Sequence, residues 1–206
     1  MVRARGLRLA TASAALLVVW TALAFTPQVG RLDLWLTRWM QGHAARPLDV
    51  ALSLLSLLGN VEVDAVLGLA VGLVRVRAGD GRTASALWSL LVLGTVAELA
   101  AKQVLPHPAV PRALRRGGLN PTHHVFSTRY GFPSGHAFRT LFLAGALWPV
   151  LGRRPLLRGL LVGGVVAVDI ALVYLGDHWA SEVIAGNLLA GICLGLLEVF
   201  GRPRSA

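Results

Sequence analysis

The 206-residue chain is poor in cysteine, in lysine and in charged residues of both signs. Its single cysteine, Cys193, excludes an internal disulfide and a metal site built from several cysteines. Only 15% of the residues are charged and 55% are hydrophobic, whereas about a quarter of an ordinary soluble domain is charged. Together with a mean hydropathy of +0.63, this composition argues against a water-soluble protein.

The formal charge of +10 comes from 20 basic residues, of which 19 are arginine and one is Lys102. In a soluble protein such an excess would suggest nucleic-acid binding. Here many of the arginines lie in short segments between long hydrophobic runs, so we expect no nucleic-acid partner and a role for the charges in membrane orientation.

The hydrophobic runs predict an all-α, six-span membrane bundle that forms one domain over residues 1–206. Each run is near the roughly 20 residues that a helix needs to cross the hydrocarbon core. The predicted spans are Leu9–Thr26, Leu48–Val74, Ala84–Leu105, Ser134–Leu151, Leu156–Leu175 and Ala180–Phe200. The second contains Gly59 and Asn60, and we expect one kinked, partly buried helix there in preference to a helix with a break.

The arginines also predict the orientation of the bundle. Eleven of the 20 basic residues lie before the first span, after the sixth, or in the links after the second and fourth spans. With six spans, these segments all lie on one side of the membrane, and their positive charge predicts that this side, with both termini, is the cytoplasm. The outer face then receives loops 27–47 and 106–133, with an interfacial helix predicted at 31–43. The N-terminal segment also matches a secretory signal peptide, with Ala-x-Ala at 22–24, but we expect it to remain as a span.

Residues suited to phosphate chemistry lie at the outer ends of the predicted spans: Lys102, Ser134, Gly135, His136 and His178. Ser134 is a favourable N-cap and Gly135 lets the backbone approach closely, so this helix start suits an anion. Two histidines can divide nucleophilic attack and leaving-group protonation. Glu182, one helical turn after His178, is placed to orient that ring.

Lys102, the sequence PSGH at 133–136 and the sequence YLGDHWASEV at 174–183 resemble the three signatures of the phosphatidic acid phosphatase type 2 superfamily. This superfamily includes membrane lipid phosphatases, undecaprenyl diphosphate phosphatases and soluble vanadium haloperoxidases. The resemblance implies a phosphohistidine mechanism without a metal or other cofactor. In it His178 is the nucleophile, Glu182 replaces the aspartate that orients it, and His136 is the general acid. Lys102, Ser134 and Gly135 match phosphate-binding positions.

The chain departs from this pattern at two arginines that would grip the phosphoryl oxygens. The Arg-Pro pair of the first signature is replaced by Ala109 and Val110, and the Ser-Arg pair that begins the third is replaced by Ala171 and Leu172. Arg139, three residues after His136, is the expected phosphate-binding replacement. The alternative for Arg139 is a structural ion pair with Glu98 or Asp169. The loop arginines, for which contact with lipid headgroups is favoured over catalysis, are Arg112, Arg115, Arg116 and Arg129.

The other polar residues have simpler interpretations. We expect three loop histidines to be solvated, with a zinc site that includes His136 as the alternative: His107, His123 and His124. Three carboxylates offer a proton or ion pathway as an alternative function: Glu62, Asp64 and Glu98. Glu98 and Lys102 are four residues apart, and an ion pair that positions the lysine is the simpler account.

The sequence thus predicts a multi-pass lipid phosphatase with its site at the outer face of the cell membrane. Undecaprenyl diphosphate, phosphatidate and phosphatidylglycerophosphate are all compatible substrates. One alternative is a catalytically impaired homologue that binds a lipid phosphate or a partner protein. Another is a phosphotransferase, in which an alcohol replaces water. No oligomeric state is predicted.

Overall fold

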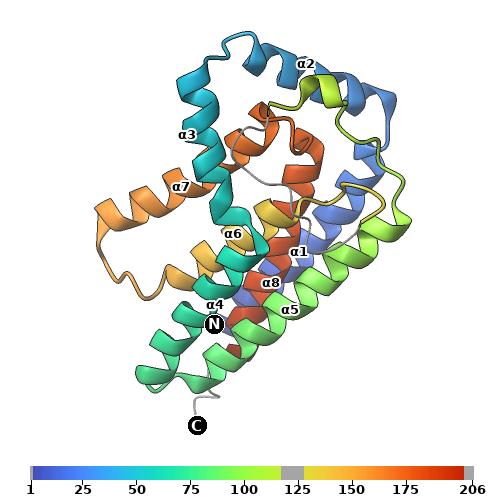
Figure 1. Cartoon of the computed structure of the whole chain (residues 1–206). Helices are drawn as coiled ribbons and strands as arrows, with labels where there is room; N and C mark the ends of the chain where they lie inside the picture. Colours follow the sequence, from blue (N-terminus) through green and yellow to red (C-terminus); the bar gives the residue numbers. More distant parts are fainter. Residues whose placement is uncertain (1, 117–127, 202–206) are drawn as a thin grey trace.

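The computed structural model describes residues 2–116 and 128–201, and within these ranges it is helical and has no strand (Figure 1). The α-helices are α1 (Val2–Ala24), α2 (Pro27–Gln41), α3 (Arg46–Ser56), α4 (Val61–Arg77), α5 (Gly81–Val104), α6 (Gly135–Leu147), α7 (Pro155–Tyr174) and α8 (Ala180–Gly201). Two short 3-10 helices are η1 (Leu57–Gly59) and η2 (Arg112–Leu114).

Helix α8 is the centre of the bundle and packs against α1, α5 and α6. A buried hydrophobic cluster joins α8 to α4, α5 and α6, with Leu87, Phe138, Phe142 and Cys193 among its members. Helix α1 begins and α8 ends at one end of the bundle, while α2 lies across the other end (Figure 1). The predicted interfacial segment 31–43 thus largely falls within α2.

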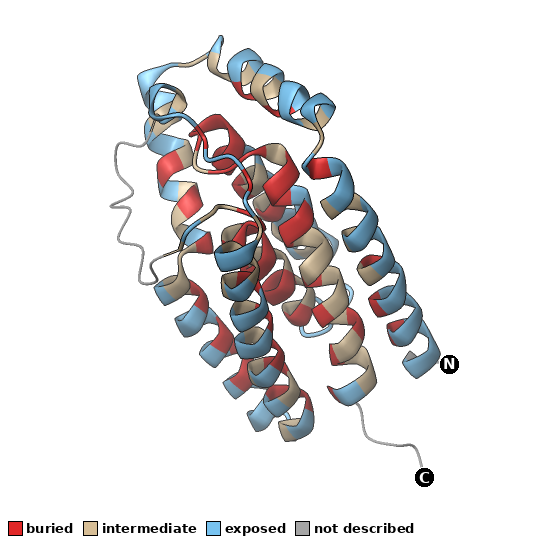
Figure 2. Ribbon diagram, turned by 90° about the vertical axis from the view of Figure 1, so that its right-hand side faces the viewer, coloured by how far each residue is buried: buried red, intermediate tan, exposed pale blue. Residues whose placement is uncertain are grey.

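The outside of the bundle is hydrophobic along much of its length, as expected for contact with lipid. Large side chains such as Val18, Leu93 and Leu160 are more than half exposed, and the outward faces of the helices are coloured as exposed in Figure 2. Within the described residues, four helices are long and apolar enough to cross a membrane, namely α1, α5, α7 and α8. The chain is therefore a multi-pass membrane protein.

The second predicted span is broken, and the expectation of one kinked helix is wrong. Helix α3 ends at Ser56, η1 follows, and α4 begins after Asn60, so that the two α-helices are bent by 54°. Asn60 has an extended backbone conformation at φ −70° and ψ 142°, which ends the helical hydrogen-bond ladder. At this break, Gly59 and Asn60 make polar contacts with side chains of α6.

The helix at the fourth predicted span is shorter than expected, so the structure does not confirm the prediction of six full-length spans. Helix α6 ends at Leu147, and turns follow from Trp148 to Arg153, where the sequence contains Pro149 and a Gly152 with φ +56°. A helix of 13 residues rises about 20 Å, less than the roughly 30 Å of the hydrocarbon core. In the part of the chain that the structure describes, the bundle contains four helices long enough to span, one bent pair and the short α6.

Candidate active site

The two histidines of the predicted site meet at the end of the bundle that carries α2. His136 lies in the first turn of α6 and His178 in the connection between α7 and α8, and their ring centroids are 6.0 Å apart. The backbone N–H of Ser134 donates to the carbonyl of Glu182 over 2.9 Å, which joins the start of α6 to the first turn of α8. Segments more than 40 residues apart in sequence are thereby held together.

Glu182 lies where the four-residue spacing places it. His178 Nδ1 donates to Glu182 Oε2 over 2.6 Å, and both side chains are buried. The backbone N–H of Trp179 lies 3.4 Å from the same oxygen. Because Nδ1 carries the proton in this pair, Nε2 of His178 keeps its lone pair and is the nitrogen that can act as a nucleophile.

The N-terminus of α6 is a second part of the site. Ser134 is the N-cap, and its hydroxyl accepts from the N–H of Ala137 over 3.3 Å. A side chain at Gly135 would not fit, because a Cβ there would lie 2.6 Å from Glu98 Cδ. Glu98 in turn pairs with Lys102, whose Nζ is 2.6 Å from Oε1. This ion pair, expected from the spacing, holds the lysine on the carboxylate that lies against the start of α6.

Arg139 is buried and all three of its donor groups have protein acceptors. Nε donates to Asp64 Oδ2 over 3.0 Å and Nη1 donates to Glu98 Oε2 over 3.1 Å. Nη2 donates to the carbonyl of Gly59 over 3.2 Å. The ion pair with Glu98 is thus present, whereas the alternative partner Asp169 accepts from Asn187 instead. Arg139 acts here as a link between α4, α5 and α6.

His136 has a partner that the sequence did not indicate. Its Nε2 lies 3.0 Å from Asn60 Oδ1, at the break between α3 and α4. Asparagine is a common N-cap, but the Asn60 side chain makes no cap hydrogen bond to α4. The contact to His136 uses that side chain instead.

His107 is buried, and the expectation that it is solvated is wrong. Its Nδ1 lies 3.0 Å from Glu182 Oε1, the carboxylate oxygen that His178 does not use. The residues His123 and His124 lie outside the described residues. Within residues 2–116 and 128–201, no group of three or more His, Cys, Asp or Glu side chains is placed to hold a metal ion.

The other charged residues near this end mainly tie segments together. Arg116 forms a bidentate pair with Asp49, and these hydrogen bonds raise the pKa of Arg116. Asp33 of α2 accepts from both the N–H and the hydroxyl of Ser181, although burial raises the pKa of Asp33. Arg112, Arg115 and Arg129 are exposed, and Nε of Arg115 donates to the Val110 carbonyl.

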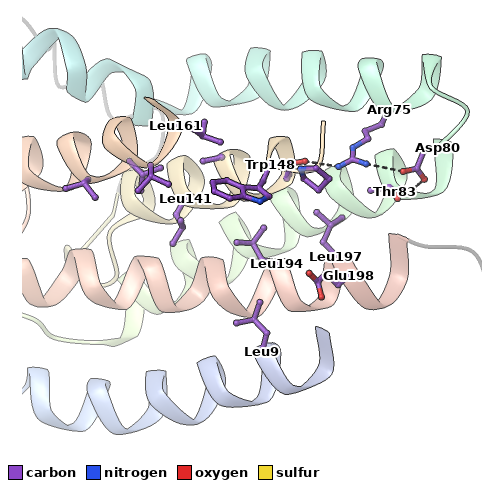
Figure 3. A pocket seen from close by; sticks show the side chains of 17 residues that line it. Leu9, Arg75, Asp80, Thr83, Leu141, Trp148, Leu161, Leu194, Leu197 and Glu198 are labelled. Carbon is purple, nitrogen blue, oxygen red and sulfur yellow. Dashed lines mark hydrogen bonds and ion pairs between the residues drawn. The ribbon is translucent and has the colours of Figure 1, made fainter. Parts of the chain in front are cut away.

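A cavity of about 520 Å³ lies away from the histidines, toward the end where α4 turns into α5. Its walls are largely apolar side chains of α6, α7 and α8, and its polar residues include Arg75, Asp80 and Glu198 (Figure 3). Neither His136 nor His178 lines this cavity. This cavity is therefore separate from the pair of histidines.

Comparison with known proteins identifies the family and a similar fold. A family model described as the PAP2 superfamily matches residues 82–204. A solved structure of similar fold is a transmembrane PAP2-type phosphatidylglycerolphosphate phosphatase from Bacillus subtilis, with a TM-score of 0.69 and 18% sequence identity. The similarity covers 91% of this chain and 92% of that one. A comparison with curated protein sequences finds no match. Because the family model matches more than half of this chain, the chain belongs to the PAP2 superfamily.

Proposed function

We propose that the chain is an integral membrane lipid phosphatase that works through a phosphohistidine at His178. The observation that carries this proposal is the fixed pair of His178 and Glu182, with His136 across from it at a centroid distance of 6.0 Å. The N-terminus of α6 carries His136, and Lys102 pairs with Glu98, which lies against Gly135. These groups would supply N–H donors and positive charge for a phosphoryl group.

The reaction divides into two displacements. Nε2 of His178 attacks phosphorus, the bond to the lipid oxygen breaks, and His136 gives its proton to that oxygen. Glu182 accepts the Nδ1–H bond throughout and stabilises the positive charge that develops on the His178 ring. Water then attacks phosphorus while His136 takes its proton, and the P–N bond breaks to release phosphate.

Lys102 and the start of α6 are proposed to bind the phosphoryl oxygens without the help of an arginine. The three donor groups of Arg139 are engaged by Asp64, Glu98 and Gly59, so this arginine supports Lys102 through Glu98. We place the site at the outer leaflet, where the lipid enters from the side with its headgroup toward Ser134 and Gly135.

The test is phosphate release by the detergent-purified protein. Undecaprenyl diphosphate, phosphatidate and phosphatidylglycerophosphate are each supplied in EDTA without added metal. We expect release from at least one lipid, loss of that release in His178→Ala, and no effect of EDTA. An exposed histidine after α2 that packs against Trp39, His43, provides the matched control as His43→Ala.

The outcomes separate the proposed reaction from its alternatives. Release that survives in His178→Ala contradicts the phosphohistidine. No release from any lipid by a folded protein favours a lipid-binding homologue. Transfer that appears only when an alcohol acceptor is added favours a phosphotransferase.

A further inference from the structure

Glu182 is held from two sides, although the proposed mechanism uses only one of its oxygens. Oε2 accepts from His178 and Oε1 accepts from His107, over 2.6 and 3.0 Å. The carboxylate is 2% exposed and His107 is 4% exposed, so water competes little for either contact. Hydrogen bonds thus connect His178, Glu182 and His107 in a buried chain that leads away from Nε2 of His178.

The ring of His107 is itself held in place by its surroundings. Phe25 packs edge-on against it and Phe132 lies against it in a tilted arrangement, both with centroids 5.3 Å away. The loop that carries His107 is anchored where Trp179 Nε1 donates to the Pro108 carbonyl over 2.8 Å. Because Trp179 directly follows His178, the loop and the nucleophile are positioned by the same turn.

A glutamate needs such a second contact more than an aspartate does. Glutamate has one more rotatable bond between backbone and carboxylate, so a single hydrogen bond fixes its plane less well. A carboxylate that turns would carry the His178 ring with it, and displacement of a reacting group by about 1 Å can cost about 100-fold in rate. A donor on Oε1 removes this freedom.

We infer that His107 is a positioning residue for the nucleophile, acting by a hydrogen bond from its Nδ1–H to Glu182. This inference rests on the proposed phosphohistidine function. In this role His107 does not contact the substrate and does not transfer a proton during the reaction. Its effect therefore falls on kcat and not on lipid binding.

The test uses His107→Asn and His107→Leu in the purified full-length protein, with phosphatidate or whichever lipid the wild type hydrolyses. Asparagine places an N–H donor near the position of Nδ1, whereas leucine fills the space without a donor. We expect His107→Leu to lower kcat about 10- to 100-fold with KM changed less than about twofold, and His107→Asn to restore most of the loss.

A double-mutant cycle with Glu182→Ala shows whether His107 acts through this carboxylate. If it does, adding His107→Leu to Glu182→Ala causes no further loss of kcat. Additive losses would contradict the inference, as would a wild-type kcat in His107→Leu or an equal loss in both His107 variants. Thermal unfolding of each variant in detergent shows that the compared proteins are folded.

The two proposals fail in different ways. A wild-type protein whose phosphate release is absent, or is unchanged by His178→Ala, overturns the phosphohistidine function and the role of His107 with it. A wild type that depends on His178 but tolerates His107→Leu overturns the positioning role alone.

Discussion

At the scale of single residues, each histidine of the site has a partner fixed by another element. Glu182 of α8 holds Nδ1 of His178, and Asn60 at the break before α4 holds Nε2 of His136. A ring whose orientation is already fixed by a hydrogen bond loses little conformational entropy when the substrate binds. In the proposed mechanism, the two rings are therefore already oriented for different roles before the lipid binds.

Replacement of Asn60 should affect His136, the proposed general acid. In Asn60→Ala the ring of His136 loses its acceptor, and we expect hydrolysis of phosphatidate to fall at least about 10-fold, a part of the 10²–10⁴-fold that general acid–base catalysis typically contributes. The leaving group of 4-nitrophenyl phosphate is much more acidic and needs little protonation. Its hydrolysis should fall less, and the ratio of the two rates is the measurement.

Asn60→Asp is the matched variant, because it keeps an oxygen acceptor at the same position. It should retain more phosphatidate hydrolysis than Asn60→Ala. An equal loss of both substrates in Asn60→Ala would show that the residue does not act through leaving-group protonation.

At the scale of helices, buried charges join α4, α5 and α6. Arg139 pairs with Asp64 and Glu98, and Glu98 also pairs with Lys102, so two cations balance two carboxylates. Removing one member leaves a buried charge without its partner, which typically costs about 3–5 kcal/mol. We expect Arg139→Ala to lower the unfolding midpoint in detergent and to reduce activity by displacing Lys102.

The charge balance itself can be tested with a second substitution. Asp64→Ala removes the carboxylate that Arg139→Ala leaves unpaired, so the double variant should be more stable than Arg139→Ala alone. A double variant that is destabilised by the sum of the two single effects would show that the pair is not coupled.

The contact between α1 and α8 depends on small residues, as is common between membrane helices. A Cβ at Gly195 would lie 2.5 Å from the backbone nitrogen of Ala10. Gly195→Leu should therefore force the helices apart and destabilise the protein by about 1–3 kcal/mol. Gly163 on α7 has open space around its Cβ position, and Gly163→Leu is the control that should leave the unfolding midpoint nearly unchanged.

The elements that could be predicted from the sequence are those that depend on local signals. Hydrophobic length predicted α1, α5, α7 and α8, and a four-residue spacing predicted that Glu182 contacts His178. The break at Asn60 could not be predicted in this way, since it coincides with contacts to Arg139 and His136 from a distant helix. The burial of His107 likewise depends on aromatic rings supplied by other segments.

At the scale of the whole molecule, the two ends of the bundle carry different polar residues. The end with α2 carries the histidines, while the turn from α4 to α5 at the opposite end carries Arg75, Arg77 and Arg82. The positive-inside rule predicts that this turn lies in the cytoplasm. A site at the histidines would then act on lipids of the outer leaflet.

Cysteine labelling in intact cells tests this orientation. Ala113 in η2 and Ala78 in the turn after α4 are both exposed alanines at opposite ends of the bundle, so Ala113→Cys and Ala78→Cys form a matched pair. We expect a membrane-impermeant maleimide to label the first in intact cells and the second only after the cells are permeabilised. The natural Cys193 is buried and serves as the unlabelled background. The reverse pattern would place the histidines on the cytoplasmic side, where the enzyme would meet the lipid phosphates of the inner leaflet.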